Sequence, residues 1–178
     1  EGYRQSAMEQ FRVISKEIYS RNWPKEIFSP NIQRAYFLSP TQRDKLYFEF
    51  EEGQNILIPA DTTVYDELKQ AHTFSIKDQF YWDLNSEQSM ATSIKKIEVI
   101  NNRKVVVHFN FPYEMDTFGY LPSFHAGYIA YKYVYPYPGP YFKNKLGMRA
   151  LGFSGFPIQM VDGESDVFTI GPNPATKQ

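Results

Sequence analysis

Two runs of strand-forming residues on either side of an asparagine pair constrain the fold of this chain more than any other feature. Ile94–Ile100 alternates around Ile97 and Val99, and Lys104–Phe109 is rich in valine. Asparagine tolerates the positive φ that both central positions of a type I′ turn require. The sequence therefore predicts an antiparallel hairpin over residues 94–110, which we expect at the centre of a sheet.

Other segments also have the alternation of strands. Residues 45–50 place Leu46, Phe48 and Phe50 on one face, and residues 32–38, 56–58 and 166–170 are shorter candidates. Phe, Tyr and Trp make up 17% of the chain. Because aromatic side chains favour strands, a β-rich body is expected.

Two helices are predicted. Residues 6–22 have apolar residues at helical spacing on one face, a capping-box pattern from Ser6 to Glu9, and Trp23-Pro24 as the expected end. Residues 63–71 form the second candidate. The expected fold is α+β: a mainly antiparallel sheet, with the N-terminal amphipathic helix packed on it, in a single domain over residues 1–178.

The predicted core combines the apolar face of the first helix with the inward faces of the strands. Its members are Phe11, Ile14, Ile18, Leu46, Phe48, Phe50, Ile97, Val99, Val105, Val107 and Phe109.

Composition excludes several classes of function. The net charge of −1 provides no bulk attraction to nucleic acid, and the absence of Cys rules out disulfides, thiolate metal sites and Cys nucleophiles. No apolar stretch approaches the roughly 20 residues of a membrane span, and no signal peptide is found. Because the chain begins at Glu1, we expect a processed product or a piece of a longer protein.

No motif for catalysis is found either. His72, His108 and His125 lack metal-ligand spacing, and we expect His108 to be solvent-facing or hydrogen-bonded on its strand. Residues 152–156, GFSGF, lack the second glycine of a nucleophile elbow and are expected to form a turn. No phosphate-binding glycine loop occurs. We therefore expect no enzyme activity, no metal and no cofactor.

Tyrosines are the most unusual feature, because four of them alternate within residues 127–142. Such a row can stack ligands, or it can pack inside the protein with its hydroxyls reaching water. The stretch is expected to form a strand up to Tyr135, and the prolines at 136, 138 and 140 restrict its later part to a sheet edge or an extended loop. The candidate residues for binding a ligand or partner are Tyr81, Trp82, Tyr131, Tyr133, Tyr135, Tyr137 and Tyr141.

Four segments resemble parts of the bacterial family 5 extracellular solute-binding proteins, the oligopeptide, dipeptide and nickel receptors of ABC importers. Residues 35–53 are similar to an early pair of strands in that family, and 62–68, TTVYDEL, resemble a helix start. Residues 94–112 are similar to a hairpin that ends in proline, and 152–174 resemble a turn followed by a strand pair.

The resemblance implies a non-catalytic, extracytoplasmic domain, periplasmic or at the cell surface, that binds a small peptide or other solute. Family members have two lobes, so this chain would supply part of one lobe. The alternatives are a structural or assembly subunit of an envelope machine, appendage or coat that binds a protein partner, and an enzyme with a scattered site.

Overall fold

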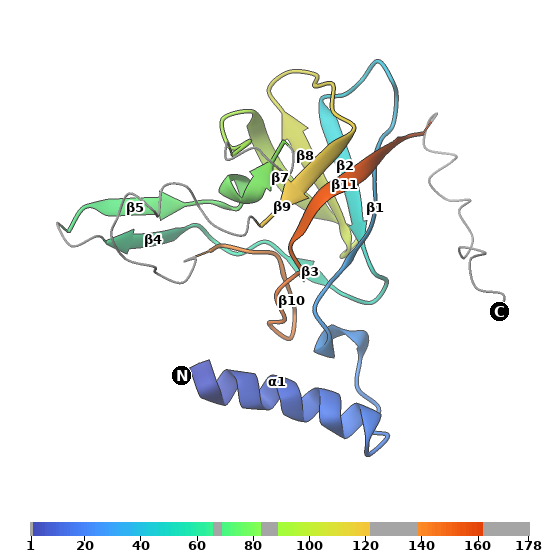
Figure 1. Cartoon of the computed structure of the whole chain (residues 1–178), viewed down its shortest axis with the longest axis vertical. Helices are drawn as coiled ribbons and strands as arrows, with labels where there is room; N and C mark the ends of the chain where they lie inside the picture. Colours follow the sequence, from blue (N-terminus) through green and yellow to red (C-terminus); the bar gives the residue numbers. More distant parts are fainter. Residues whose placement is uncertain (1, 66–68, 83–88, 122–138, 162–178) are drawn as a thin grey trace.

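The computed structural model describes residues 2–65, 69–82, 89–121 and 139–161, and strands predominate in it (Figure 1). The two short 3-10 helices are η1 (Lys25–Ile27) and η2 (Ile76–Gln79). The other elements are α1 (Gly2–Glu17), β1 (Ile32–Phe37), β2 (Lys45–Phe50), β3 (Ile56–Leu57), β4 (Thr62–Tyr65), β5 (Ala71–Phe74), β6 (Phe80–Tyr81), β7 (Ile94–Ile100), β8 (Lys104–Phe109), β9 (Thr117–Tyr120), β10 (Lys143–Asn144) and β11 (Phe153–Met160).

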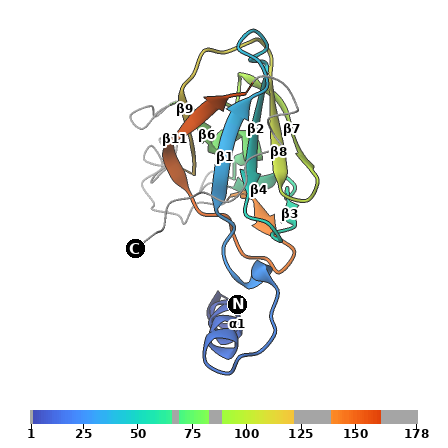
Figure 2. The ribbon, with the colours of Figure 1, turned by 90° about the vertical axis from the view of Figure 1, so that its right-hand side faces the viewer.

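Seven strands form a curled sheet in the order β6-β9-β11-β1-β2-β8-β7 (Figure 2). The pair β1 and β11 is parallel, whereas the other neighbours in this sheet are antiparallel. β10 and β3 form a small separate sheet, and β4 and β5 form another. The predicted α+β class with a mostly antiparallel sheet is confirmed.

The hairpin over residues 94–110 is confirmed as β7 and β8. Asn101 and Asn102 have φ values of 51° and 62°, the left-handed geometry expected of a type I′ turn. Its predicted central position is wrong, because β7 lies at the end of the sheet and β1 lies in the middle. Charged residues on β7, such as Lys95 and Lys96, suit an exposed edge.

Aromatic rings from distant parts of the chain fill the core. Phe48 on β2 lies 5.6 Å from Phe118 on β9, 6.0 Å from Phe80 on β6 and 5.8 Å from Phe142, centroid to centroid. Because the sheet curls, β6 and β9 lie over β2. The aromatic side chains of one sheet therefore pack against each other and form the core.

Most of the predicted core is confirmed. The buried members are Leu46, Phe48, Phe50, Val105, Val107 and Phe109, while Ile97 and Val99 are partly buried against the same cluster. The strands predicted at residues 32–38 and 56–58 are confirmed as β1 and β3.

The predicted helix over residues 63–71 is wrong, because Thr62–Tyr65 and Ala71–Phe74 pair as the antiparallel strands β4 and β5. Threonine and tyrosine favour extended backbone, and Lys69 between the strands has φ +60°. The hydroxyls of Thr63 and Thr73 lie 3.0 Å apart across this ribbon.

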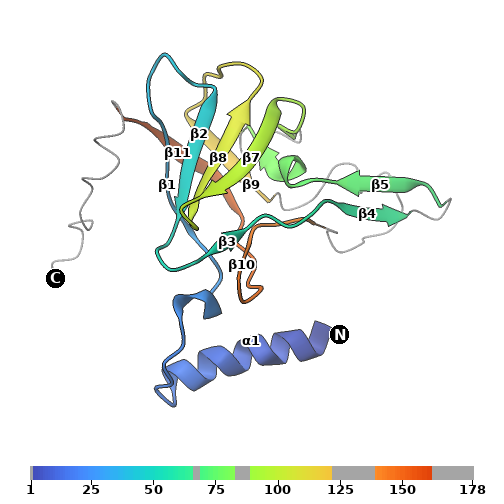
Figure 3. The same ribbon diagram turned by 180° about the vertical axis from the view of Figure 1, so that it is seen from behind.

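The first helix exists, but its predicted limits and its predicted packing differ from the structure. It begins at Gly2, so Ser6 lies within it, and it ends at Glu17, ahead of Ser20 at φ +50°. It lies below one end of the sheet, beside the β10 loop (Figures 1 and 3). Phe11 and Ile18 are 57% and 69% exposed, so their assignment to the core, with that of Ile14, is wrong.

The turn that the sequence predicts at residues 152–156 is wrong, because residues 153–160 form the strand β11. The strand pairs with β9 through its first half and with β1 through its second half, and its register shifts between Phe153 and Phe156. Gly155 in that interval has φ +60°, a conformation that glycine adopts without a side-chain clash. The predicted strands at 131–135 and 166–170 lie outside the described residues.

The same Phe-to-Ala change is expected to lower stability strongly in the core and hardly at all on α1. Phe48→Ala removes a fully buried ring and should lower the free energy of unfolding by about 3–5 kcal/mol. Phe11→Ala should change it by about 0.5 kcal/mol or less. Urea unfolding of both variants measures this, and equal losses would place Phe11 in the core after all.

Gln79 is fully buried, and neither polar atom of its side chain has a hydrogen-bond partner among the residues that the structure describes. Because an unpaired buried amide is costly, Gln79→Met should raise the free energy of unfolding by about 1 kcal/mol in urea titration. Gln54→Met is the matched control. The Gln54 carboxamide is equally buried but accepts a hydrogen bond from Asn144 at 2.9 Å, so that variant should be less stable. A loss in both variants would contradict the prediction.

Candidate interaction surface

One side of α1 faces the body of the protein, and that side is polar. The Arg12 guanidinium donates a hydrogen bond to the carbonyl of Leu146 at 3.3 Å, in the loop after β10. The Lys16 ammonium lies 4.7 Å from the ring centroid of Phe28. Both side chains are partly buried, so α1 attaches to the body through its basic residues.

The apolar stripe of α1 consists of Ala7, Phe11, Ile14 and Ile18. Ile18 lies one residue past the helix limit, but its N–H still bonds to the Ile14 carbonyl at 2.9 Å. Ile14 follows Arg12 by two residues, and Ile18 follows Lys16 by two. Each such step rotates the side chain by about 200° around a helix, so the stripe faces away from the body.

The exposure of the stripe agrees with this geometry. Phe11 is 57% exposed, Ile14 46% and Ile18 69%, and Ala7 is also exposed. Met8 and Tyr19 beside the stripe are 49% and 70% exposed. The helix is therefore amphipathic in the sense opposite to the usual one, with its polar side toward the protein.

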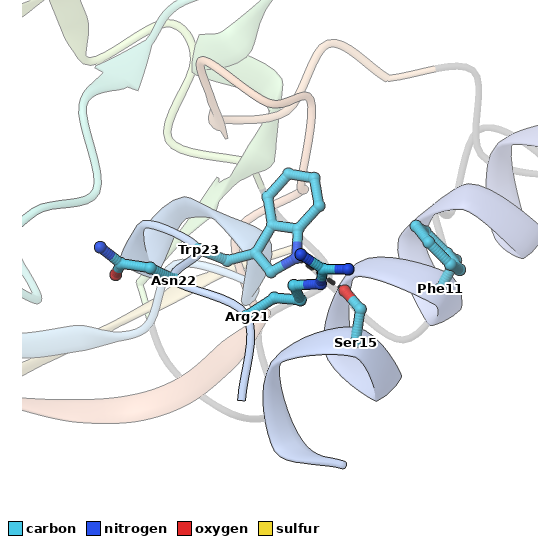
Figure 4. Close-up of a pocket in the computed structure, with 5 residues that line it drawn as sticks. All are labelled: Phe11, Ser15, Arg21, Asn22 and Trp23. Atoms are coloured by element: carbon cyan, nitrogen blue, oxygen red, sulfur yellow. Dashed lines mark hydrogen bonds between the residues drawn. The ribbon is translucent and has the colours of Figure 1, made fainter. Parts of the chain in front are cut away.

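Trp23 forms one wall of a pocket beside the stripe (Figure 4). Its indole N–H donates to the Ser15 hydroxyl at 2.6 Å, and that hydroxyl donates to the Arg12 carbonyl at 2.9 Å. The pocket has a volume of about 510 Å³ and is lined by Phe11, Ser15, Arg21, Asn22 and Trp23. This arrangement can accept an apolar side chain between two aromatic rings.

The outer face of the central strands carries a different kind of cluster, built around the buried carboxylate of Glu49. Arg34 and Lys104 lie 3.0 and 3.3 Å from its Oε1 atom. Arg103 lies 3.3 Å from Oε2, and the Tyr36 hydroxyl donates to Oε1 at 3.0 Å. The cluster therefore joins β1, β2 and β8 electrostatically.

Burial and the ionic contacts have opposite effects on the pKa of the Glu49 carboxylate. Burial raises the pKa of Glu49, but hydrogen bonds from Arg34 and Tyr36 and the charges of Arg34 and Lys104 outweigh it, so that its pKa falls below the usual value. Burial, followed by the nearby Glu49 charge, raises the pKa of Tyr36. Glu49 is therefore ionised at neutral pH and Tyr36 is protonated.

The prediction for His108 is confirmed. Its Nε2 atom lies 2.6 Å from Oε1 of Glu98 on the neighbouring strand, on the outer face of the sheet. Hydrogen bonds from Lys96 and His108 lower the pKa of Glu98. In the described part of the chain, no group of three or more His, Asp and Glu side chains could hold a metal ion.

The predicted aromatic site is only partly described. Tyr81 is buried, and burial raises its pKa to about 12. Trp82 is half-buried, 4.7 Å from the ring of Tyr113, and the half-buried ring of Tyr141 lies 4.3 Å from the Arg149 guanidinium. The remaining candidates lie outside the described residues: Tyr131, Tyr133, Tyr135 and Tyr137. A binding role for these residues stays a prediction.

Glu49→Gln should lower the free energy of unfolding by about 2 kcal/mol at pH 7, because the three cations lose their buried counter-charge. The depressed pKa of Glu49 stabilises the folded state above the unfolded pKa of about 4.3, and this contribution is lost as pH falls through the lower folded pKa. The gap between wild type and variant should therefore close in acid. Urea titrations at pH 7 and pH 3 measure this gap, and a gap of equal size at both would contradict the ionic explanation.

No helix in the described ranges is both long and apolar enough to cross a membrane. Comparison of the chain with models of protein families, with curated proteins and with solved structures gave no match.

Proposed function

We propose that this chain is a non-catalytic assembly domain, which binds a protein partner through the apolar stripe of α1. One observation carries the proposal: the stripe faces away from the sheet, and its members Phe11 and Ile18 are 57% and 69% exposed. Contiguous exposed apolar patches on soluble proteins mark sites of interaction.

The energetics support a docking role. Burying a Phe or Ile side chain contributes about 1.5–3 kcal/mol, and much of this remains unused while the stripe faces water. The pocket beside Trp23 adds a concave surface whose wall includes two aromatic rings, and buried aromatic side chains are where binding energy concentrates. A partner that covers both would gain apolar contact without rearranging the body.

A receptor for a small peptide or other solute, which the family resemblance implies, stays a prediction. The ring of Tyr81 is buried, so among its described candidates the half-buried Trp82 and Tyr141 would have to contact such a ligand. An extracytoplasmic location likewise stays a prediction. The apolar stripe, by contrast, is placed and exposed, which makes assembly the better supported function.

Photo-crosslinking in the cells that produce the protein tests the proposal. A photoreactive amino acid at Ile14 or Phe11 should give protein adducts. The same group at Ser6 should give none, because Ser6 is exposed but points about 100° away from its neighbour Ala7 in the stripe. Absence of adducts at all three positions, or equal adducts at all three, would contradict the proposal.

A further inference from the structure

We propose that the partner of the apolar stripe is a second copy of this chain, and that two α1 helices pair antiparallel. This inference rests on the proposed function and names its partner. The evidence comes from the spacing of the stripe, from the charges beside it and from its direction relative to the body.

Spacing is the first line of evidence. The stripe residues Ala7, Phe11, Ile14 and Ile18 follow one another at intervals of four, three and four residues. These are the intervals of the a and d positions of a heptad, with which one helix packs its side chains between those of another helix.

The stripe can also pair with itself. When two copies run antiparallel, Phe11 of each packs against Ile14 of the other, and Ala7 of each packs against Ile18 of the other. The same two contacts therefore occur twice around a two-fold axis, which is the arrangement of a closed dimer. In the layers where Ala7 of one copy faces Ile18 of the other, a small side chain meets a large one, so the helices can approach closely there.

Charges beside the stripe permit this pairing. In the antiparallel arrangement Gln10 faces Glu17 of the second copy on one flank of the stripe. On the other flank Ser15 is buried and hydrogen-bonded to Trp23, so it is not available to the second copy. Gln10 is uncharged, so no like charges meet on the flank of Gln10 and Glu17. The opposed macrodipoles of the two helices also favour the antiparallel direction.

The direction of the stripe leaves room for the second copy. The sheet stands above α1 in Figures 2 and 3. The bond from Arg12 to Leu146 places the polar side of α1 toward that body, so the stripe faces the opposite side. Two bodies would therefore lie on opposite sides of the helix pair. The pocket beside Trp23 flanks the stripe and would extend the contact beyond the helices.

The contact is small, so we expect a weak dimer. Stable interfaces bury about 800 Å² on each partner, and one pair of four-turn helices supplies less. We expect a dissociation constant on the order of 10–100 µM for so small a contact.

Sedimentation measurements on the purified protein test self-association. Between about 10 and 500 µM the mass of wild type should rise from 20.9 kDa toward twice that value. Ile14→Glu and Ile18→Glu should remain monomeric, because each places a charge in the layer between the helices. Ser6→Glu should behave like wild type. Circular dichroism confirms that each variant is folded, and Ile18 lies past the helix limit, so Ile18→Glu cannot disturb the helix interior.

Disulfide trapping tests the direction of pairing, and the absence of native Cys makes the result unambiguous. A mixture of Phe11→Cys and Ile14→Cys proteins should form the mixed disulfide at least about tenfold faster than either forms its own, because these positions face each other across the axis. Faster formation by Phe11→Cys alone would indicate parallel pairing and overturn the antiparallel assignment.

The outcomes separate this inference from the proposed function. If wild type stays monomeric at all concentrations while Ile14 crosslinks another protein in cells, the inference is wrong and the docking role stands. Adducts of twice the chain mass, together with self-association that Ile14→Glu abolishes, support both. Self-association that persists in both glutamate variants would show that copies meet elsewhere, and it would overturn the inference.

Discussion

The position of α1 depends on one buried side chain, that of Asn144. Its amide group donates to the carbonyls of Glu26 and Phe28 at 2.7 and 3.2 Å and to the Gln54 carboxamide at 2.9 Å. Its side-chain oxygen accepts from the backbone N–H groups of residues 146 and 148 at 3.1 and 3.0 Å. These bonds tie η1, the turn before β3 and the β10 loop together. η1 is the next element after α1, and Leu146 accepts the hydrogen bond from Arg12. The same network therefore helps to fix the position of the helix below the sheet.

The sheet needs no helix to cover it, and this explains why the apolar stripe is available. In many α+β domains a helix buries its apolar side on one face of the sheet. Here the curl of the sheet brings β6 and β9 over β2, and the rings of Phe80 and Phe118 occupy that volume against Phe48. An apolar helix face placed there would compete with rings that are already packed. The helix therefore attaches by polar contacts, and its apolar side remains exposed, where a partner can bind it.

Local features could be predicted from the sequence, whereas features that depend on distant residues could not. The asparagine turn and the alternation of β2 and β8 involve neighbouring residues, and the structure agrees with both. The central place of β1 depends on its pairing with β11, more than a hundred residues later, and no local pattern indicates it. The apolar stripe was visible at Phe11 and Ile14, but a stripe that packs on the core and one that faces a partner have the same spacing. What distinguishes them is the contact from Arg12 to Leu146, which only the tertiary structure supplies.

The ionic cluster around Glu49 and the apolar stripe of α1 respond to different solution conditions. Stability of the sheet and association through the helix can therefore be changed independently. On the outer face of the sheet the charges of Arg34, Arg103 and Lys104 are drawn toward Glu49, so that face depends on pH through the ionisation of one carboxylate. The stripe on α1 contains no charge, and burial of apolar surface is strengthened rather than screened by salts such as sulfate. A solution at neutral pH and high sulfate would therefore favour helix pairing while Glu49 stays ionised. Acid strong enough to protonate Glu49, below its lowered pKa, would weaken the ionic cluster on the outer face of the sheet and leave the driving force for pairing unchanged. A loss of association in such acid would therefore report unfolding of the body that holds α1 rather than a change at the stripe.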